Sequence, residues 1–265
     1  MRNGNYAPVN GLNLYYEVHG TGSPMILLHG GLGGIGMYEL PLPALAETHQ
    51  VIAVELQGHG HTADIDRPFS FEQMADDVAA LIAHLGLAQV DICGLSLGGG
   101  VALQTTIRHP GMVRKLAIIS APCKREGWYP EDLAGMDAMD AEAAKMMLQS
   151  PPHQAYVNVA PNPDDWSALV IKTGQLLRQD YDWSAAVAAI TAPVLIVVGD
   201  ADGVRLTHAI EMFGLLGGGK GGGPWAPLPR SRLAILPATT HFSLVESDAV
   251  VPIITAFLDA TPHAE

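Results

Sequence analysis

Short runs of apolar residues recur along the chain and are separated by longer amphipathic segments. The almost wholly apolar runs are 25–28, 51–54, 90–93, 116–119, 194–198 and, more weakly, 233–236. Strands covered by helices on both faces have this composition, because neither side of such a strand meets water. An earlier segment, 12–18, has the pattern of an antiparallel strand followed by turn residues. The runs therefore predict a mostly parallel sheet.

Helical patterns fill the segments between these strands. The clearest begins at Ser70, where Ser70-Phe71-Glu72-Gln73 has the sequence of a capping box, and its apolar face recurs until Gly86. Other helices are expected at about 97–108, 137–148, 164–177 and 249–258. Alternating strands and helices produce right-handed crossovers, so the pattern predicts a doubly wound α/β fold with ligands at the carboxyl ends of the strands.

One connection is far longer than the others. About seventy residues separate the strand ending near Ser120 from the strand starting at Val194, and they carry helical patterns with proline-rich joints. We predict that residues 122–185 form a helical cap inserted after the sixth strand, and that 1–121 and 186–265 form one core domain. The glycine-rich stretch 217–223 has no phosphate-loop spacing, and we expect it to be mobile and not catalytic.

The composition and charge of the chain indicate which kinds of partner and which cellular compartment to expect. The net charge of −13 and the lack of a Lys/Arg cluster argue against binding of nucleic acid or anionic membrane, and favour a substrate that is apolar or neutral near its reacting end. The first residues have no signal-peptide pattern, and no apolar run approaches the ~18 residues that span a bilayer, so we expect a cytoplasmic protein. The two cysteines, Cys93 and Cys123, are expected to be reduced thiols, although their strands allow a pair.

A candidate nucleophile stands where the buried run 90–93 meets a helical pattern. The segment Gly94-Leu95-Ser96-Leu97-Gly98 has the spacing of a nucleophile elbow, a sharp strand-to-helix turn that exposes the serine hydroxyl. Glycines two residues to either side remove Cβ atoms that would collide as strand and helix close together. Because the chain contains 29 glycines, the motif needs support from its context.

A serine hydroxyl needs an adjacent base, and the base needs a third group that holds its tautomer. Asp200 and Asp202 follow the apolar run 194–198, and His241 follows the run 233–236. The chain order Ser, acid, His is the order that an elbow of this kind uses. His241 is therefore the candidate general base, and either aspartate could orient it.

The negative charge of a tetrahedral intermediate requires two backbone N–H donors. Leu97, at the start of the expected helix, supplies one, and the glycine-rich segment 29–34 supplies the other, through Gly31 or alternatively Leu32. The spacing Gly-x-Gly-x-x-Gly at 31–36 also allows a dinucleotide loop, but no clear helix or acidic ribose ligand follows it.

A histidine-rich turn offers a metal-binding alternative. His59 and His61 form an H-x-H pair within 55–64, but the adjoining Asp-His pair of a metallo-hydrolase is missing. A tight turn is the preferred interpretation, and no metal is expected.

Over nearly its whole length the chain resembles the α/β-hydrolase superfamily. The resemblance is carried by His29-Gly30-Gly31, by the turn 58–62, by the segments 94–99 and 199–202, and by His241-Phe242. It implies a triad of Ser96, Asp202 and His241, and so selects Asp202 over Asp200. The Gly-Leu-Ser-x-Gly-Gly segment and the cap position are similar to those of small carboxylesterases, enol-lactonases and cofactor-free perhydrolases, which implies that no cofactor is needed.

Several positions depart from the family pattern. Relatives usually have Asp in place of Glu55, Ser in place of Thr62, and often Gly-x-Gly-His in place of the segment 238–241. Relatives that cleave carbon–carbon bonds commonly have Asn in place of Leu95. A serine at position 96 argues against dehalogenases and epoxide hydrolases, whose first step needs a carboxylate.

The expected function is hydrolysis of a carboxylic ester or lactone through an acyl-enzyme on Ser96. The alternatives are perhydrolysis or another acyl transfer at the same triad, and a receptor-like protein that turns over slowly. The expected cap offers aromatic and sulfur-containing side chains as walls of an apolar pocket, or as ordinary cap core. These are Trp128, Tyr129, Met136, Met139 and Trp166.

Overall fold

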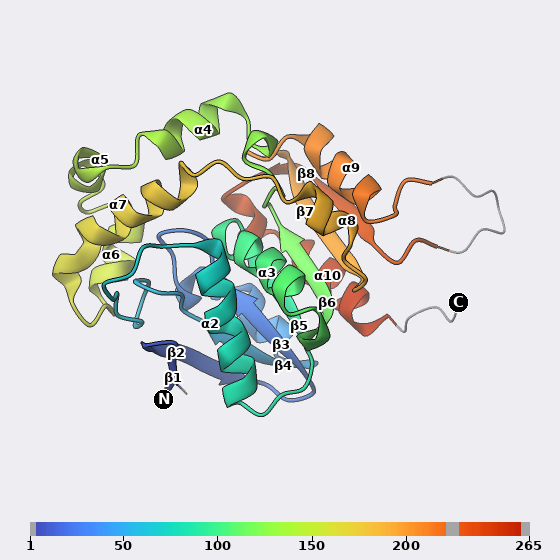
Figure 1. Cartoon of the computed structure of the whole chain (residues 1–265), viewed down its shortest axis with the longest axis horizontal. Coiled ribbons are helices and arrows are strands. Elements are labelled where there is room, and N and C mark those ends of the chain that lie inside the picture. Colours follow the sequence, from blue (N-terminus) through green and yellow to red (C-terminus); the bar gives the residue numbers. More distant parts are fainter. Residues whose placement is uncertain (1–3, 221–227, 261–265) are drawn as a thin grey trace.

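The computed structural model describes residues 4–220 and 228–260, which form a layered α/β structure around one sheet (Figure 1). The described strands lie in the spatial order β1-β2-β4-β3-β5-β6-β7-β8. Their bounds are β1 Gly4–Val9, β2 Leu12–His19, β3 Ser23–Leu28, β4 His49–Val54, β5 Val90–Leu95, β6 Val113–Ile119, β7 Val194–Ala201 and β8 Arg232–Thr240.

The sheet is mostly parallel, as predicted. Strands β1 and β2 pair antiparallel to each other, and β2 pairs antiparallel to β4. All remaining neighbours pair in parallel, from β4 and β3 across to β7 and β8. The apolar runs identify every strand except β1. Its only buried residues are Ala7 and Val9, too few apolar side chains to stand out in the sequence.

Helices cover both faces of this sheet. Their bounds are α1 Pro41–Leu45, α2 Phe71–His84, α3 Leu97–Arg108, α4 Pro130–Asp137, α5 Ala141–Met146, α6 Pro151–Val157, α7 Trp166–Leu177, α8 Ser184–Ala188, α9 Leu206–Leu215 and α10 Val250–Asp259. Helix α2 begins as expected, with Ser70 Oγ accepting a hydrogen bond from the Gln73 N–H. Helix α3 ends at Arg108, where the sequence predicted its end.

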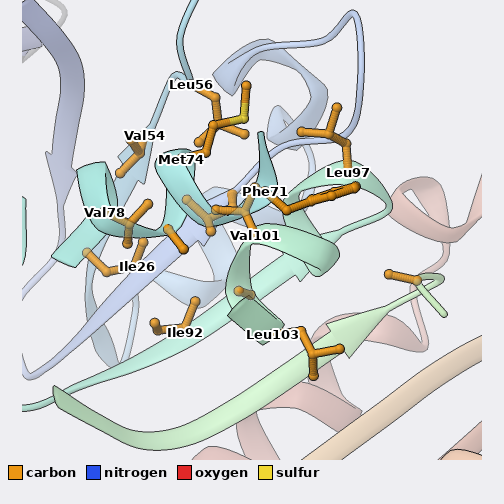
Figure 2. Close-up of a cluster of buried hydrophobic side chains, with 14 of the residues drawn as sticks. Ile26, Val54, Leu56, Phe71, Met74, Val78, Ile92, Leu97, Val101 and Leu103 are labelled. Carbon is orange, nitrogen blue, oxygen red and sulfur yellow. The ribbon is translucent and has the colours of Figure 1, made fainter. Parts of the chain in front are cut away.

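Alternate residues of the central strands face two separate apolar clusters. On one face Ile26 and Ile92 pack with Met74 and Val78 of α2 and Val101 of α3 (Figure 2). On the other face Met25 and Leu27 pack with residues of α1 and α10. Burial of each such side chain contributes about 1.5–3 kcal/mol of favourable transfer free energy. Helices exclude water from both faces of the sheet, which explains why these strands have continuous apolar sequences.

Helices α4 to α7 follow β6 and form an arch beside the sheet (Figure 1). The predicted helix at 164–177 is found as α7. The predicted helix at 137–148 is wrong in extent, because α4 ends at Asp137 and a new helix begins after Asp140. The backbone of Asp140 is extended, and its carboxylate accepts hydrogen bonds from the N–H groups of Glu142 and Ala143, at 2.9 and 3.0 Å.

Some expectations from the sequence concern smaller features. Cys93 and Cys123 are buried free thiols. The glycine-rich stretch 217–223, which we expect to be mobile, lies partly outside the described residues. Within 4–220 and 228–260, no helix is both long enough and apolar enough to cross a bilayer.

Candidate active site

Ser96 lies at the turn between β5 and α3, with φ of 52° and ψ of −117°. An added Cβ at Gly94 would come within 2.2 Å of the Gly98 carbonyl oxygen, and one at Gly98 within 2.4 Å of the His29 carbonyl oxygen. Only glycine fits at either position, because these neighbours are backbone atoms that cannot move aside. The tight turn and the left-handed φ of Ser96 have the geometry of a nucleophile elbow.

The three side chains of the expected triad lie together, although they are far apart in the sequence. His241 Nε2 is 3.1 Å from Ser96 Oγ, and His241 Nδ1 is 3.0 Å from Asp202 Oδ1. The ring of Trp128 meets the His241 ring edge-on at a centroid distance of 5.4 Å. An imidazole hydrogen-bonded on one side to a carboxylate and on the other to a hydroxyl can take a proton from that hydroxyl and return it.

Asp202 and Asp200 have different environments. The Asp202 carboxylate is buried, and it also accepts hydrogen bonds from the N–H groups of Gly199 and Val204, both at 3.2 Å. Burial acts to raise the pKa of Asp202, but hydrogen bonds from His241 and Ser120 outweigh it, so the pKa lies below its ordinary value. Asp200 is exposed and accepts a hydrogen bond from the Thr239 N–H. The ionised carboxylate next to the imidazole is therefore that of Asp202.

A fourth polar side chain, absent from the sequence analysis, contacts both members of this pair. Ser120 directly follows β6, is fully buried, and places its Oγ 2.6 Å from Asp202 Oδ1 and 2.5 Å from His241 Nδ1. A polar residue after the apolar run 116–119, at the edge where the other site residues gather, is the signal that would have found it.

Left-handed backbone conformations concentrate around these residues. Of the six described non-glycine residues with positive φ, four lie in or close to the carboxyl ends of β3, β5, β6 and β8. They are Leu32, Ser96, Ser120 and Ala238. Each such conformation costs on the order of 1–3 kcal/mol, and clusters of them are typical of functional sites.

The expected oxyanion donors also lie beside Ser96. A Cβ at Gly30 would be 3.6 Å from the Ser96 Cβ, and one at Gly31 would be 3.6 Å from the Leu97 Cδ1. Leu97 is the first residue of α3, so its N–H has no carbonyl partner one turn earlier in the helix. The loop after β3 and the start of α3 therefore approach each other next to the hydroxyl.

Two buried polar side chains support that loop. His29 Nε2 accepts a hydrogen bond from the Leu56 N–H at 3.1 Å, so its Nδ1 carries the proton and donates to the Gly30 carbonyl at 2.8 Å. Burial lowers the pKa of His29 to about 4, which keeps this ring neutral. Glu55 accepts from the Ile35 N–H at 3.1 Å and from the His61 N–H at 2.6 Å.

A pocket opens next to Ser96, and its empty volume, open solvent included, is about 230 Å³. Its wall consists mostly of apolar and aromatic side chains from the core and from the segment after β6. They are Phe71, Leu97, Gly100, Ala121, Pro122, Trp128, Leu177 and Tyr181, with Ser96 itself. Of the cap residues singled out in the sequence, Trp128 lines this pocket. Trp166 instead packs within the arch, where its Nε1–H donates to the Ala144 carbonyl.

The alternative sites receive no support from the geometry. Among the residues that the structure describes, no group of three or more His, Cys, Asp and Glu side chains is arranged to hold a metal ion. His61 pairs with Glu55, whereas the His59 Nδ1–H donates to the Gln57 carbonyl. The segment 31–36 leads into a short 3-10 helix, Ile35–Tyr38, rather than the long helix of a dinucleotide loop.

A family model described as the alpha/beta hydrolase fold matches residues 23–173. A putative carbamate hydrolase, RutD of Azorhizobium caulinodans, is 32% identical over 166 residues, which are 62% of this chain and 60% of that protein. The match thus spans about three fifths of the relative's own length.

Solved structures show the same fold at lower identity. E-2-(acetamidomethylene)succinate hydrolase superposes with a TM-score of 0.77 at 22% identity, covering 98% of this chain and 100% of the other. The enol-lactonase from Burkholderia xenovorans superposes with a TM-score of 0.73 at 21% identity, covering 96% and 100%. At these identities the likeness concerns the fold alone.

Proposed function

The chain belongs to the α/β-hydrolase family, and on that premise we propose that it is a serine hydrolase that cleaves a carboxylic ester or lactone. The observation that carries this proposal is the hydrogen-bonded series from Ser96 Oγ through His241 to the buried Asp202 carboxylate. Such a series activates a hydroxyl that would otherwise be a weak nucleophile.

In the proposed reaction His241 Nε2 takes the Ser96 proton while Ser96 Oγ attacks the substrate carbonyl carbon. The N–H groups of Gly31 and Leu97 stabilise the negative charge on the carbonyl oxygen. His241 then gives the proton to the leaving alkoxide, and the acyl group remains on Ser96. A water molecule that loses a proton to His241 attacks the acyl carbon, the bond to Ser96 Oγ breaks as His241 returns the proton to Oγ, and the acid is released. With a lactone the alcohol stays tethered to the acid, so the product is the opened ring.

The apolar wall of the pocket supports a substrate whose acyl portion is hydrophobic and uncharged. The proposed acyl side chain is small, because the bulky side chains of Phe71 and Trp128 line the pocket next to Ser96. We propose that residues 122–185 act as the cap that bounds this pocket, and that the protein works in the cytoplasm without a cofactor. The enol-lactonase from Burkholderia xenovorans shares the fold of this chain, and the likeness concerns the fold alone.

The experiment combines labelling with a substrate series. A fluorophosphonate probe is expected to label the wild type and not Ser96→Ala, and p-nitrophenyl esters are expected to be cleaved faster at short chain length than at long. A lactone panel run in parallel separates lactonase from esterase activity. Equal turnover by Ser96→Ala would disprove the proposal. Acyl products of peroxide or alcohol that exceed the free acid would instead identify an acyl transferase.

A further inference from the structure

Ser120 Oγ lies between the acid and the base of the proposed triad, and it is not part of a standard Ser-His-Asp arrangement. Its side chain is fully buried, and it is absent from the residues that line the pocket. Any effect of Ser120 on the reaction must therefore pass through Asp202 or His241, and not through contact with the substrate.

The protons in this group can be assigned by counting donors and acceptors. Asp202 is ionised because its pKa is lowered, so it can only accept. The Ser120 O–H must then donate to Asp202 Oδ1, over 2.6 Å, which leaves its lone pairs facing His241 Nδ1 at 2.5 Å. The Nδ1–H of His241 thus has two acceptors, Ser120 Oγ and Asp202 Oδ1. Both hydrogen bonds favour the tautomer whose Nε2 lone pair faces Ser96.

The backbone of Ser120 holds the hydroxyl in place, but it does so in a conformation that is unfavourable for a non-glycine residue. Its N–H donates to the Val197 carbonyl at 2.8 Å, and its φ is 51°, a conformation that glycine adopts more easily. Glycine at this position would relieve the backbone strain. The presence of serine instead of glycine therefore indicates that the hydroxyl has a role.

We propose that Ser120 is a positioning residue that fixes the His241 tautomer and ring orientation, and that it shares with Asp202 the stabilisation of the imidazolium formed during catalysis. When Ser96 gives up its proton, His241 becomes a cation whose Nδ1–H remains bonded to Ser120 and Asp202, and no proton leaves either partner. This inference rests on the proposed function, since it needs His241 to act as the base.

The first test uses Ser120→Ala and Ser120→Gly, which both remove the hydroxyl and differ in backbone strain. Glycine should raise Tm relative to alanine, because it relaxes the left-handed conformation. Both variants should lower kcat on the best p-nitrophenyl ester by about 10- to 100-fold with KM nearly unchanged, since hydrogen bonds to charged groups are lost. The proposal would be overturned if either variant kept the wild-type kcat. It would also be overturned if the loss of kcat in the two variants were explained by their loss of Tm.

The second test is a double-mutant cycle of Ser120→Ala with Asp202→Asn. If Ser120 acts through the Asp202–His241 pair, its removal should cost much less in the Asp202→Asn background than in the wild type. Independent, multiplying losses would show a merely structural role and would refute the inference. Ser96→Ala provides the reference: if it retains turnover, the proposed function itself fails, whereas an inactive Ser96→Ala beside a fully active Ser120→Ala defeats only the role of Ser120.

Discussion

Lys172 of α7 donates a hydrogen bond to Asp64 at 2.5 Å and so joins the arch after β6 to the loop before α2. The same ammonium group donates to the carbonyls of Ile65 and Arg67, at 2.9 and 3.1 Å. Both members of the ion pair are mostly buried, with side-chain exposures of 21% and 17%. This contact ties the segment that we propose as the cap to the core.

Replacing Lys172 with methionine keeps most of the side-chain volume and removes all three hydrogen bonds. We expect a loss of about 1–3 kcal/mol in the free energy of unfolding, together with a several-fold rise in KM as the arch shifts over the pocket. Urea denaturation and steady-state kinetics measure the two effects. The matched control is Lys145→Met, which breaks the exposed pair with Glu142 and should change neither quantity. Equal behaviour of the two variants would contradict this account.

Asp202→Asn replaces an ionised hydrogen-bond acceptor with an amide. The N–H₂ group of this amide can donate to His241 Nδ1, which favours the tautomer that is protonated on Nε2. We expect kcat to fall by about 10²–10⁴ with little change in KM, because the imidazole loses its productive tautomer. Asp200→Asn is the control, since Asp200 is exposed and its carboxylate accepts a hydrogen bond from the Thr239 N–H rather than from His241. A larger loss in Asp200→Asn than in Asp202→Asn would reverse the assignment of the acid.

Glu55→Gln tests the support of the loop after β3. The carboxylate accepts from the Ile35 N–H and twice from His61, so an amide nitrogen at either oxygen position places a donor against a donor. We expect a loss of about 1–3 kcal/mol in unfolding free energy and a lower kcat, because the loop that carries Gly31 loses its anchor. The exposed substitution Glu47→Gln should alter neither. Unchanged kcat and stability in Glu55→Gln would count against an anchoring role.

Two buried histidines make stability depend on pH. Burial lowers the pKa of His29 and of His59 from 6.5 to about 4. Between these values the unfolded chain binds more protons than the native protein, so native stability is complete above about pH 6.5 and falls as the pH drops towards 4. For two protons the slope reaches about 2.7 kcal/mol per pH unit.

Urea denaturation at a series of pH values between 7 and 4.5 measures this slope. His59→Asn keeps a donor near the Gln57 carbonyl and removes one of the two titrating rings, so its slope should be about half that of the wild type. A wild-type stability that is flat over this range would show that the rings are protonated in the native protein.

Most of the architecture follows from short segments of sequence. Residues 25–28 and 51–54 identify central strands because burial on both faces demands continuous apolar sequence. The elbow at Ser96 could also be predicted from a short segment, because nearby backbone atoms leave no room for a side chain at Gly94 or Gly98. The break between α4 and α5 escaped prediction because the Asp140 cap competes with an otherwise continuous helical pattern.

The parts that needed the tertiary structure are contacts between strand ends. Asp200 lies near the end of β7 and Asp202 directly follows this strand, and only the local backbone there decides that the Asp202 carboxylate meets His241. Ser120 joins them because the register of β6 against β7 brings its N–H to the Val197 carbonyl. Hydrophobic periodicity and steric exclusion act over a few residues and can be read from the chain. The direction of a polar side chain depends instead on partners roughly 40 to 145 residues away, which come within reach only when the sheet has formed.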